Sequence, residues 1–361
     1  STNINGVTVN GTSNTGTGVI INEGANVINA SVNGNSNGTG VSITGAVNIT
    51  GSTVTGNASG NGNGVNISGN ITDGVISGSA TGNGSGVGIS GDSTLNNTTV
   101  SGNGTDGAGV SISGNLSNSG NSTVTGNATG NGNGVNISGN ITDGVISGSA
   151  TGNGSGVGIS GDSTLNNTTV NGNGTDGSGV NISGNLSNSG NSTVTGNASG
   201  NGTGVDINGT VTGGDITGNA SGNGNGVNIS GNITDGVISG HAVNGNGVEY
   251  TGPSTLTNAT VSGTSVHGYD VKEYLQDAIQ QHARSTQAAL AELRAEGSQV
   301  TETSGYRPET RTLTISVCDE ENNCSRNTVL SSAEADVQPP YSHTDVAAKP
   351  MTSGSEKNVN P

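Results

Sequence analysis

Residues 52–91 read STVTGNASGNGNGVNISGNITDGVISGSATGNGSGVGISG, and residues 122–161 repeat them with a single change, Thr129 in place of Ser59. The opening of the same stretch returns at Ser192, so successive copies begin 70 residues apart. A duplicated stretch of this size is typical of repeat proteins, in which each unit buries its apolar side chains against its neighbours.

A shorter period runs inside the long one. A Gly-Val dipeptide, in most copies followed by Ile two residues after the valine, recurs every 21 to 25 residues. A disordered Gly/Ser/Asn tract, which the composition alone would also allow, has no reason to keep this period. The period predicts stacked coils, with one inner line formed by Val19, Val41, Val65, Val87, Val110, Val135, Val157, Val180, Val205, Val227 and Val248.

Apolar and polar residues alternate within each coil, as in Val65-Asn66-Ile67, and this is the period of a strand with one buried face. A second apolar place holds Val54, Val75, Val100, Val124, Val145 and Val170, and a third holds Val47, Ile71, Leu95 and Leu116. These apolar places predict two or three short strands in each coil. We expect the Gly-Asn-Gly and Thr-Gly-Asn tracts to supply the positive-φ residues of the corners.

The fold class that these patterns predict is all-β: a right-handed parallel β-helix over residues 1–265, in coils of 22 to 25 residues. At the strand spacing of a sheet, eleven coils give a rod roughly 50 Å long. Residues 266–298 are expected to form a helical cap or linker that begins near Asp270. Residues 299–330 are expected to form a β-hairpin, and residues 331–361 a disordered tail.

The two cysteines, Cys318 and Cys324, lie at the tip of the expected hairpin. Leu313, Ile315 and Val317 alternate up to the first cysteine, so a local disulfide between the two would close the tip. Two free thiols are the alternative, and an oxidising compartment would favour the bridge.

The charge pattern argues against several functions. The formal net charge is −17, and every Lys and Arg lies at or beyond Lys272. The coils therefore lack the cations that nucleic acids require and the clustered acids and bases of polysaccharide-cleaving enzymes. We expect no enzymatic activity, no catalytic residue, no metal site, no cofactor, no nucleic-acid partner and no membrane insertion.

Many asparagines begin an Asn-x-Ser/Thr sequon, the acceptor of N-glycosylation. Chance accounts for part of this, because Ser and Thr are abundant and the duplication multiplies each instance. The possible glycosylation sites include Asn66, Asn70, Asn136, Asn140, Asn228 and Asn232.

The coil length, the GVNISGN type of repeat and the terminal Cys318/Cys324 pair together resemble the filamentous-haemagglutinin-like exoproteins of two-partner secretion in Gram-negative bacteria. The likeness covers roughly residues 1–265, and the chain, which starts at Ser1 without an initiator Met, would be the C-terminal part of such a protein. The resemblance implies export through an outer-membrane transporter and a place outside the cell. It also implies a cysteine loop that retains the protein at its transporter, and in some relatives an asparagine glycosyltransferase as a further partner.

The function that the resemblance implies is adhesion: a secreted or cell-surface stalk with an anchoring region, binding a glycan or protein receptor of the host. A passive spacer filament of a contact-dependent toxin-delivery exoprotein is the alternative. An ice- or surface-binding solenoid is a third, weakened because Thr-x-Thr occurs sporadically, as at Thr53, Thr123 and Thr193, rather than on each successive coil.

Overall fold

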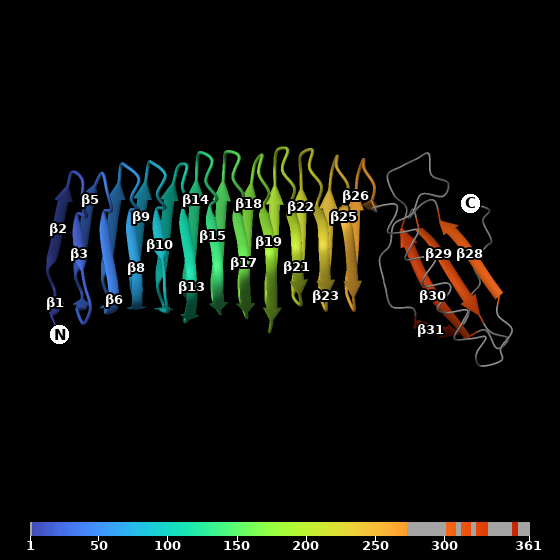
Figure 1. The fold of residues 1–361 in the computed structure, drawn as a ribbon, viewed down its shortest axis with the longest axis horizontal. Helices are drawn as coiled ribbons and strands as arrows, with labels where there is room; N and C mark the ends of the chain where they lie inside the picture. The colour runs from blue at the N-terminus through green and yellow to red at the C-terminus, as the bar shows by residue number, and fades with distance from the viewer. Residues whose placement is uncertain (1, 273–300, 308–311, 319–322, 331–348, 353–361) are drawn as a thin grey trace.

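The computed structural model of the chain describes residues 2–272, 301–307, 312–318, 323–330 and 349–352. Residues 2–272 form one parallel β-helix, a straight stack of coils seen from the side in Figure 1. Two parallel sheets, here called sheet A and sheet B, run along the whole stack, and each coil contributes to both. The predicted all-β parallel β-helix is confirmed.

Sheet A has 15 strands and sheet B has 12. Sheet A comprises β1 (Asn3–Asn5), β3 (Val19–Ile21), β4 (Asn26–Ile28), β6 (Val41–Thr50), β8 (Val65–Thr72), β10 (Val87–Ile89), β11 (Ser93–Asn96), β13 (Val110–Ser119), β15 (Val135–Thr142), β17 (Val157–Asn166), β19 (Val180–Ser189), β21 (Val205–Thr212), β23 (Val227–Thr234), β25 (Val248–Thr257) and β27 (Val271–Lys272). Sheet B comprises β2 (Thr8–Ser13), β5 (Ser31–Ser36), β7 (Thr53–Ala58), β9 (Val75–Ala80), β12 (Thr99–Gly104), β14 (Thr123–Ala128), β16 (Val145–Ala150), β18 (Thr169–Gly174), β20 (Thr193–Ala198), β22 (Asp215–Ala220), β24 (Val237–Ala242) and β26 (Thr260–Ser265).

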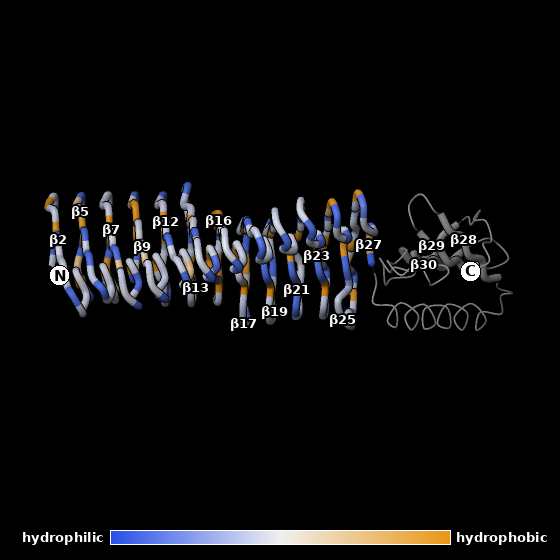
Figure 2. Tube along the Cα trace, turned by 90° about the horizontal axis from the view of Figure 1, so that it is seen from above, coloured by the Kyte–Doolittle hydropathy of each residue, from blue (hydrophilic) through white to orange (hydrophobic). Residues whose placement is uncertain are grey.

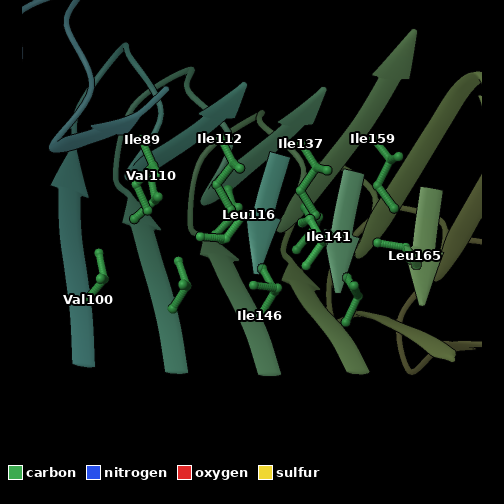
Figure 3. Packing of buried hydrophobic residues seen from close by; sticks show 14 of the residues in the cluster. Ile89, Val100, Val110, Ile112, Leu116, Ile137, Ile141, Ile146, Ile159 and Leu165 are labelled. Atoms are coloured by element: carbon green, nitrogen blue, oxygen red, sulfur yellow. The ribbon is translucent and has the colours of Figure 1, made fainter. Parts of the chain in front are cut away.

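The eleven predicted valines stack on one inner line. Val135 of β15 pairs with Val110 on one side and Val157 on the other, and the same register continues from Val19 to Val248. Val271 of β27 adds a twelfth member beyond the predicted end. Figure 3 shows the interior that these valines share with isoleucine and leucine side chains from neighbouring coils. β-branched side chains fill a pleated interior of this width with few voids.

The prediction for the second apolar place was wrong at two positions. Val54, Val100, Val124 and Val170 are buried, but Val75 and Val145 are 46% and 38% exposed. Their neighbours Ile76 and Ile146 take the inner position, because the strand register aligns Ile146 with Val124 and Val170. The adjacent apolar pair Val-Ile left the direction of the side chains ambiguous in the sequence.

The third apolar place is buried as predicted, at Val47, Ile71, Leu95 and Leu116. It is not a single line, however, because Leu116 pairs with Ser93 while Leu95 pairs with Asn118. Ten-residue strands such as β13 therefore have two inward positions after their central bend. Figure 2 shows short hydrophobic stretches interspersed with hydrophilic ones along the rod.

In each coil the turn from sheet A to sheet B contains a residue with a left-handed backbone, and in two coils a second one, Gly144 or Gly214, follows it. The first such residue of each turn has a φ between 47° and 71°, and these residues are Gly6, Asn29, Gly51, Asp73, Asn97, Gly120, Asp143, Asn167, Gly190, Gly213, Asp235 and Asn258. Glycine, Asn and Asp are the residues that enter this region at the lowest cost, so the sequence of the turn follows from its geometry.

The glycines of the Gly-Asn-Gly tracts have a different role from the one predicted. Their backbones, for example at Gly62 and Gly84, are not left-handed. Instead, a Cβ atom added to Gly84 would lie 2.0 Å from the carbonyl oxygen of Gly62 on the coil below. Close stacking of backbone on backbone, rather than a turn conformation, explains these glycines.

The C-terminal boundary of the rod also differs from the prediction. Val271–Lys272 forms β27, which pairs with β25, at the point where the helix of residues 266–298 was expected to begin. Val271 is fully buried and begins one more coil on the stack. The rest of the expected helix lies outside the described residues.

Sheet C is antiparallel, with the strand order β28 (Thr301–Arg307), β29 (Thr312–Cys318), β30 (Asn323–Leu330) and β31 (Lys349–Thr352). The pairing of β29 with β30 is the hairpin expected within residues 299–330. The tail expected to be disordered, residues 331–361, contributes β31, which pairs with β30. The other residues of that tail lie outside the described part of the chain.

Candidate functional site

The outer face of sheet A carries a ladder of amide side chains that runs along the rod. Asn48 Nδ2 donates to Asn26 Oδ1 (3.4 Å), and Asn70 Nδ2 donates to Asn48 Oδ1 (3.2 Å). Thr94 Oγ1 then donates to Asn70 Oδ1 (2.6 Å). An Asn amide offers two donors and two acceptor lone pairs, so each member can bond to the coils on both sides.

Three of the predicted glycosylation sites, Asn70, Asn140 and Asn232, are exposed on this face. Asn140 repeats the bonds of Asn70, because its Nδ2 donates to Asn115 Oδ1 (2.8 Å) and its Oδ1 accepts from Thr164 Oγ1 (2.7 Å). Both side chains are therefore accessible but already bonded to neighbouring coils. Their glycosylation stays a prediction.

The other three predicted sites, Asn66, Asn136 and Asn228, are half-buried at the Val-x-Ile position of sheet A. The Oδ1 of Asn66 accepts from Asn63 Nδ2 (2.6 Å), and the same contact recurs from Asn133 to Asn136 and from Asn225 to Asn228. The six asparagines thus occupy two separate columns of sheet A, and they do not converge on a single site.

Aspartates recur 70 residues apart in the duplicated units, as at Asp92 and Asp162, and they bond to the next coil rather than to one another. Asp92 Oδ1 accepts from Asn115 Nδ2 (2.8 Å), and Asp162 Oδ1 accepts from Asn185 Nδ2 (2.8 Å). Asp106 accepts the backbone N–H of Asn131 (3.2 Å). Each of these three aspartates bonds to the following coil, a role that the spacing of 70 residues did not indicate.

Ionisable groups are sparse over the rod. Within the described residues, no group of three or more His, Cys, Asp or Glu side chains is close enough to hold a metal ion. Near the C-terminal end of the rod, Lys272 Nζ lies 3.6 Å from Glu249 Oε1. Burial raises the pKa of Asp206, which lies half-buried in β21.

Two solvent-open hollows lie on the edge of sheet B, where a strand ends and the loop back to sheet A begins. We call the two together the edge groove. Its N-terminal segment, from β2 to β9, has a volume of about 380 Å³, and its C-terminal segment, from β18 to β22, has a volume of about 200 Å³. One wall is a column of side chains on sheet B, the floor is Ala, Gly or Ser, and the other wall is mostly Ser and Thr. The residues used below are Asn35, Asn57, Ala58, Ser59, Asn173, Asn197, Ala198, Ser199 and Asn219.

The wall of the edge groove on sheet B is itself a ladder. Asn57 Nδ2 donates to Asn35 Oδ1 (2.8 Å). In the C-terminal segment, Asn197 Nδ2 donates to Asn173 Oδ1 (3.1 Å), and Asn197 Oδ1 accepts from Asn219 Nδ2 (2.9 Å). The sequence showed these asparagines only as members of the abundant Asn class, and their alignment emerges from the register of sheet B.

The predicted cysteine pair is aligned by the backbone of sheet C. Cys318 of β29 and Cys324 of β30 are directly opposite each other in the antiparallel register. Opposite residues of an antiparallel pair have Cα atoms about 4.5 to 5.5 Å apart, within the range that a disulfide spans. The disulfide itself remains a prediction.

A search of the described residues for a helix long and apolar enough to cross a membrane found none. We also compared the chain with protein-family models, with curated proteins and with solved structures, and none of the three comparisons found a match.

Proposed function

We propose that the chain is the repeat stalk and C-terminal anchoring region of a secreted or cell-surface adhesin that attaches bacteria to host cells or surfaces. The observation that supports this most is the uninterrupted stack of residues 2–272, in which twelve strands of sheet B pair in one continuous series. At a strand spacing of about 4.8 Å, twelve coils span about 55 Å.

A solenoid suits a stalk for a physical reason. Each coil contacts only its neighbours, so coils can be added or removed without altering the rest of the core. The length of the rod can therefore change by duplication, and the copies at residues 52–91 and 122–161 are the product of such a change. The non-catalytic role rests on the lack of Lys and Arg before Lys272 and on the separation of the aspartates along the rod.

Attachment of coated beads to cultured host cells tests the proposal. We expect beads that carry the native chain to attach more often than beads that carry the same chain after heat unfolding. Equal attachment of the two preparations would overturn the adhesin function.

A shortened rod separates an adhesive stalk from a passive spacer. Deletion of residues 122–191 removes one 70-residue unit and joins Asn121 to Ser192, a junction that reproduces the native Asn191-Ser192. If the coils carry the adhesive surface, beads with the shortened chain attach less well than beads with the native chain. Undiminished attachment would instead show that the adhesive surface lies outside the repeated coils, which then serve as a spacer.

A further inference from the structure

The edge groove repeats the same polar groups at the spacing of the coils. Asn35, Asn57, Ser79, Asn103, Asn127, Ser149, Asn173, Asn197 and Asn219 form one column, because they are successive register partners in sheet B. The two groove segments lie at the two ends of this column. A ligand that fits one coil therefore fits the next after a shift of about 4.8 Å along the rod.

The column retains hydrogen-bonding capacity on its solvent side. Asn197 uses one N–H toward Asn173 and one lone pair toward Asn219. An Asn side chain has two N–H donors and two acceptor lone pairs, so one of each remains to bond water or a ligand. On the opposite wall, Ser199 presents an exposed hydroxyl that can both donate and accept. The exposed hydroxyl of Ser221 donates to the carbonyl oxygen of Ala198 (3.4 Å) and keeps its acceptor lone pairs for a ligand.

The lining excludes several other kinds of ligand. Both segments are lined by Asn, Ser, Thr, Ala and Gly. A nucleic acid or an acidic polysaccharide would find no cation there to neutralise its charge. A protein partner normally inserts aromatic or Arg anchors into a well-packed pocket, and the small Ala58 and Ala198 of the floor line an open groove instead.

We propose that the edge groove binds a linear, uncharged polysaccharide laid along the rod, with its hydroxyl groups bonded to the asparagine column and the Ser/Thr wall. This proposal rests on the proposed adhesin function and names the ligand class of its surface. Each coil contributes weak bonds that compete with water, so affinity comes from many coils that engage one chain at once. Affinity for the polymer should therefore rise with its length.

A triple variant, Asn57→Ser/Asn127→Ser/Asn197→Ser, tests the asparagine column, because Asn57 and Asn197 line the two groove segments and Asn127 lies on the column between them. Serine is already accepted in this column, at Ser79 and Ser149, so the variant should fold. A matched control on sheet A is Asn70→Thr/Asn140→Thr/Asn232→Thr, because threonine already occupies that column at Thr94, Thr164 and Thr210. Each triple removes three sequons, so the two are also matched for loss of possible glycosylation.

The measurement is affinity electrophoresis of the full chain through gels that contain a linear β-linked glucan, a linear α-linked glucan or the acidic polysaccharide hyaluronan. We expect retardation by at least one neutral glucan, growing with glucan chain length, and no retardation by hyaluronan. The groove variant should bind about tenfold more weakly, since multivalent attachment multiplies the loss at each coil. The sheet A control should bind as the native chain does. Circular dichroism verifies that all three proteins keep the β-helix.

Three results would overturn the proposal: no retardation by either neutral glucan, stronger retardation by hyaluronan, or an equal loss in both triple variants. The bead assay keeps this failure apart from failure of the adhesin function. If the chain attaches beads to cells but binds no glucan, only the polysaccharide proposal is overturned. If the chain binds glucan through the groove but does not attach beads, only the adhesin function is overturned.

Discussion

Asn97 lies one coil beyond Asp73 and donates its Nδ2 to Asp73 Oδ1 at 2.8 Å, and the two backbones are both left-handed, with φ of 49° and 51°. Asn and Asp suit this turn for two reasons: they tolerate the left-handed backbone, and their side chains form hydrogen bonds between successive coils. Asn258 and Asp235 repeat the arrangement at 2.7 Å.

Substitution of Asn97 separates the backbone requirement from the side-chain bond. Asn97→Ala places a Cβ-bearing residue without a bonding side chain in the left-handed region, at a cost of about 1 to 2 kcal/mol. Asn97→Gly loses the bond but relieves the backbone, as at Gly120 on the next coil. We expect thermal denaturation to show a lower midpoint for the alanine variant than for the glycine variant. The reverse order would mean that the left-handed backbone is not what selects the residue at this position, and the difference between the native chain and the glycine variant measures the loss of the side-chain bond.

Glycine on the inner side of sheet B sets the thickness of the rod. A Cβ on Gly148 would lie 2.0 Å from the carbonyl oxygen of Gly156 and 2.8 Å from Cγ2 of Val157. Gly156 and Val157 lie across the interior from Gly148 in the same coil, so β16 and the start of β17 would have to move apart. Gly148→Ala is therefore expected to destabilise the rod by about 1 to 3 kcal/mol or more, as overpacked cores do. Ser149→Ala, on the outward side of the same strand, serves as the control in urea unfolding and should change little.

The adjacent pair Val145-Ile146 tests the strand register. Ile146 is fully buried and Val145 is 38% exposed. Ile146→Ala should destabilise by about 2 to 5 kcal/mol because it leaves a cavity, whereas Val145→Ala should stay within about 0.5 kcal/mol. Urea unfolding of the two variants gives the comparison. A larger loss for Val145→Ala would restore the register first expected from the sequence.

These positions show what the sequence can and cannot predict. The period of the Gly-Val dipeptide identified the inner valine line, since an apolar residue must return to the interior once per coil. It could not orient Val145 and Ile146, because both are apolar and only pairing with Val124 and Val170 decides between them. The edge groove was equally hidden, because Asn57 and Asn197 align only once the unequal coil lengths are resolved by register.

The end of the rod illustrates a different difficulty. Asp270 and Glu273 resemble the start of a capped helix, and local propensity favours a helix for the residues that follow. Pairing of Val271 with Val248 takes precedence, because it buries one more valine on the existing line. Tertiary burial thus shifted the boundary of the rod by several residues.

Asp206 should make the stability of the rod depend on pH. It lies between Asn181 and Asn228 in the register of sheet A, and burial raises its pKa above the ordinary value. The folded chain therefore holds the proton more tightly than the unfolded chain does. The contribution of Asp206 to the free energy of unfolding is most favourable below the ordinary pKa of 3.8, and it is lost as the pH rises through the folded pKa.

Asp206→Asn reproduces the neutral side chains on both neighbouring coils. At neutral pH we expect the variant to be more stable than the native chain by at most about 1 kcal/mol, because partial exposure screens the charge. The difference should vanish when denaturation is followed below pH 3.8, where the native carboxyl is protonated in both states. A variant that is less stable at neutral pH would contradict this.

Cys318 and Cys324 are predicted to form a disulfide in the exported protein, and their opposed positions in β29 and β30 favour it. Five residues lie between them, and the chain-entropy model gives about 2 kcal/mol for so short a loop. The bridge belongs to sheet C, so the coils of residues 2–272 should not depend on it.

Mass spectrometry of non-reduced peptides establishes whether the bond forms. Cys318→Ser should leave the melting of the β-helix unchanged and increase the amount of protein released from the cell surface, the result expected of an anchoring loop. Unfolding of the whole rod in this variant would instead make the bridge structural, and unchanged release would remove its role in retention.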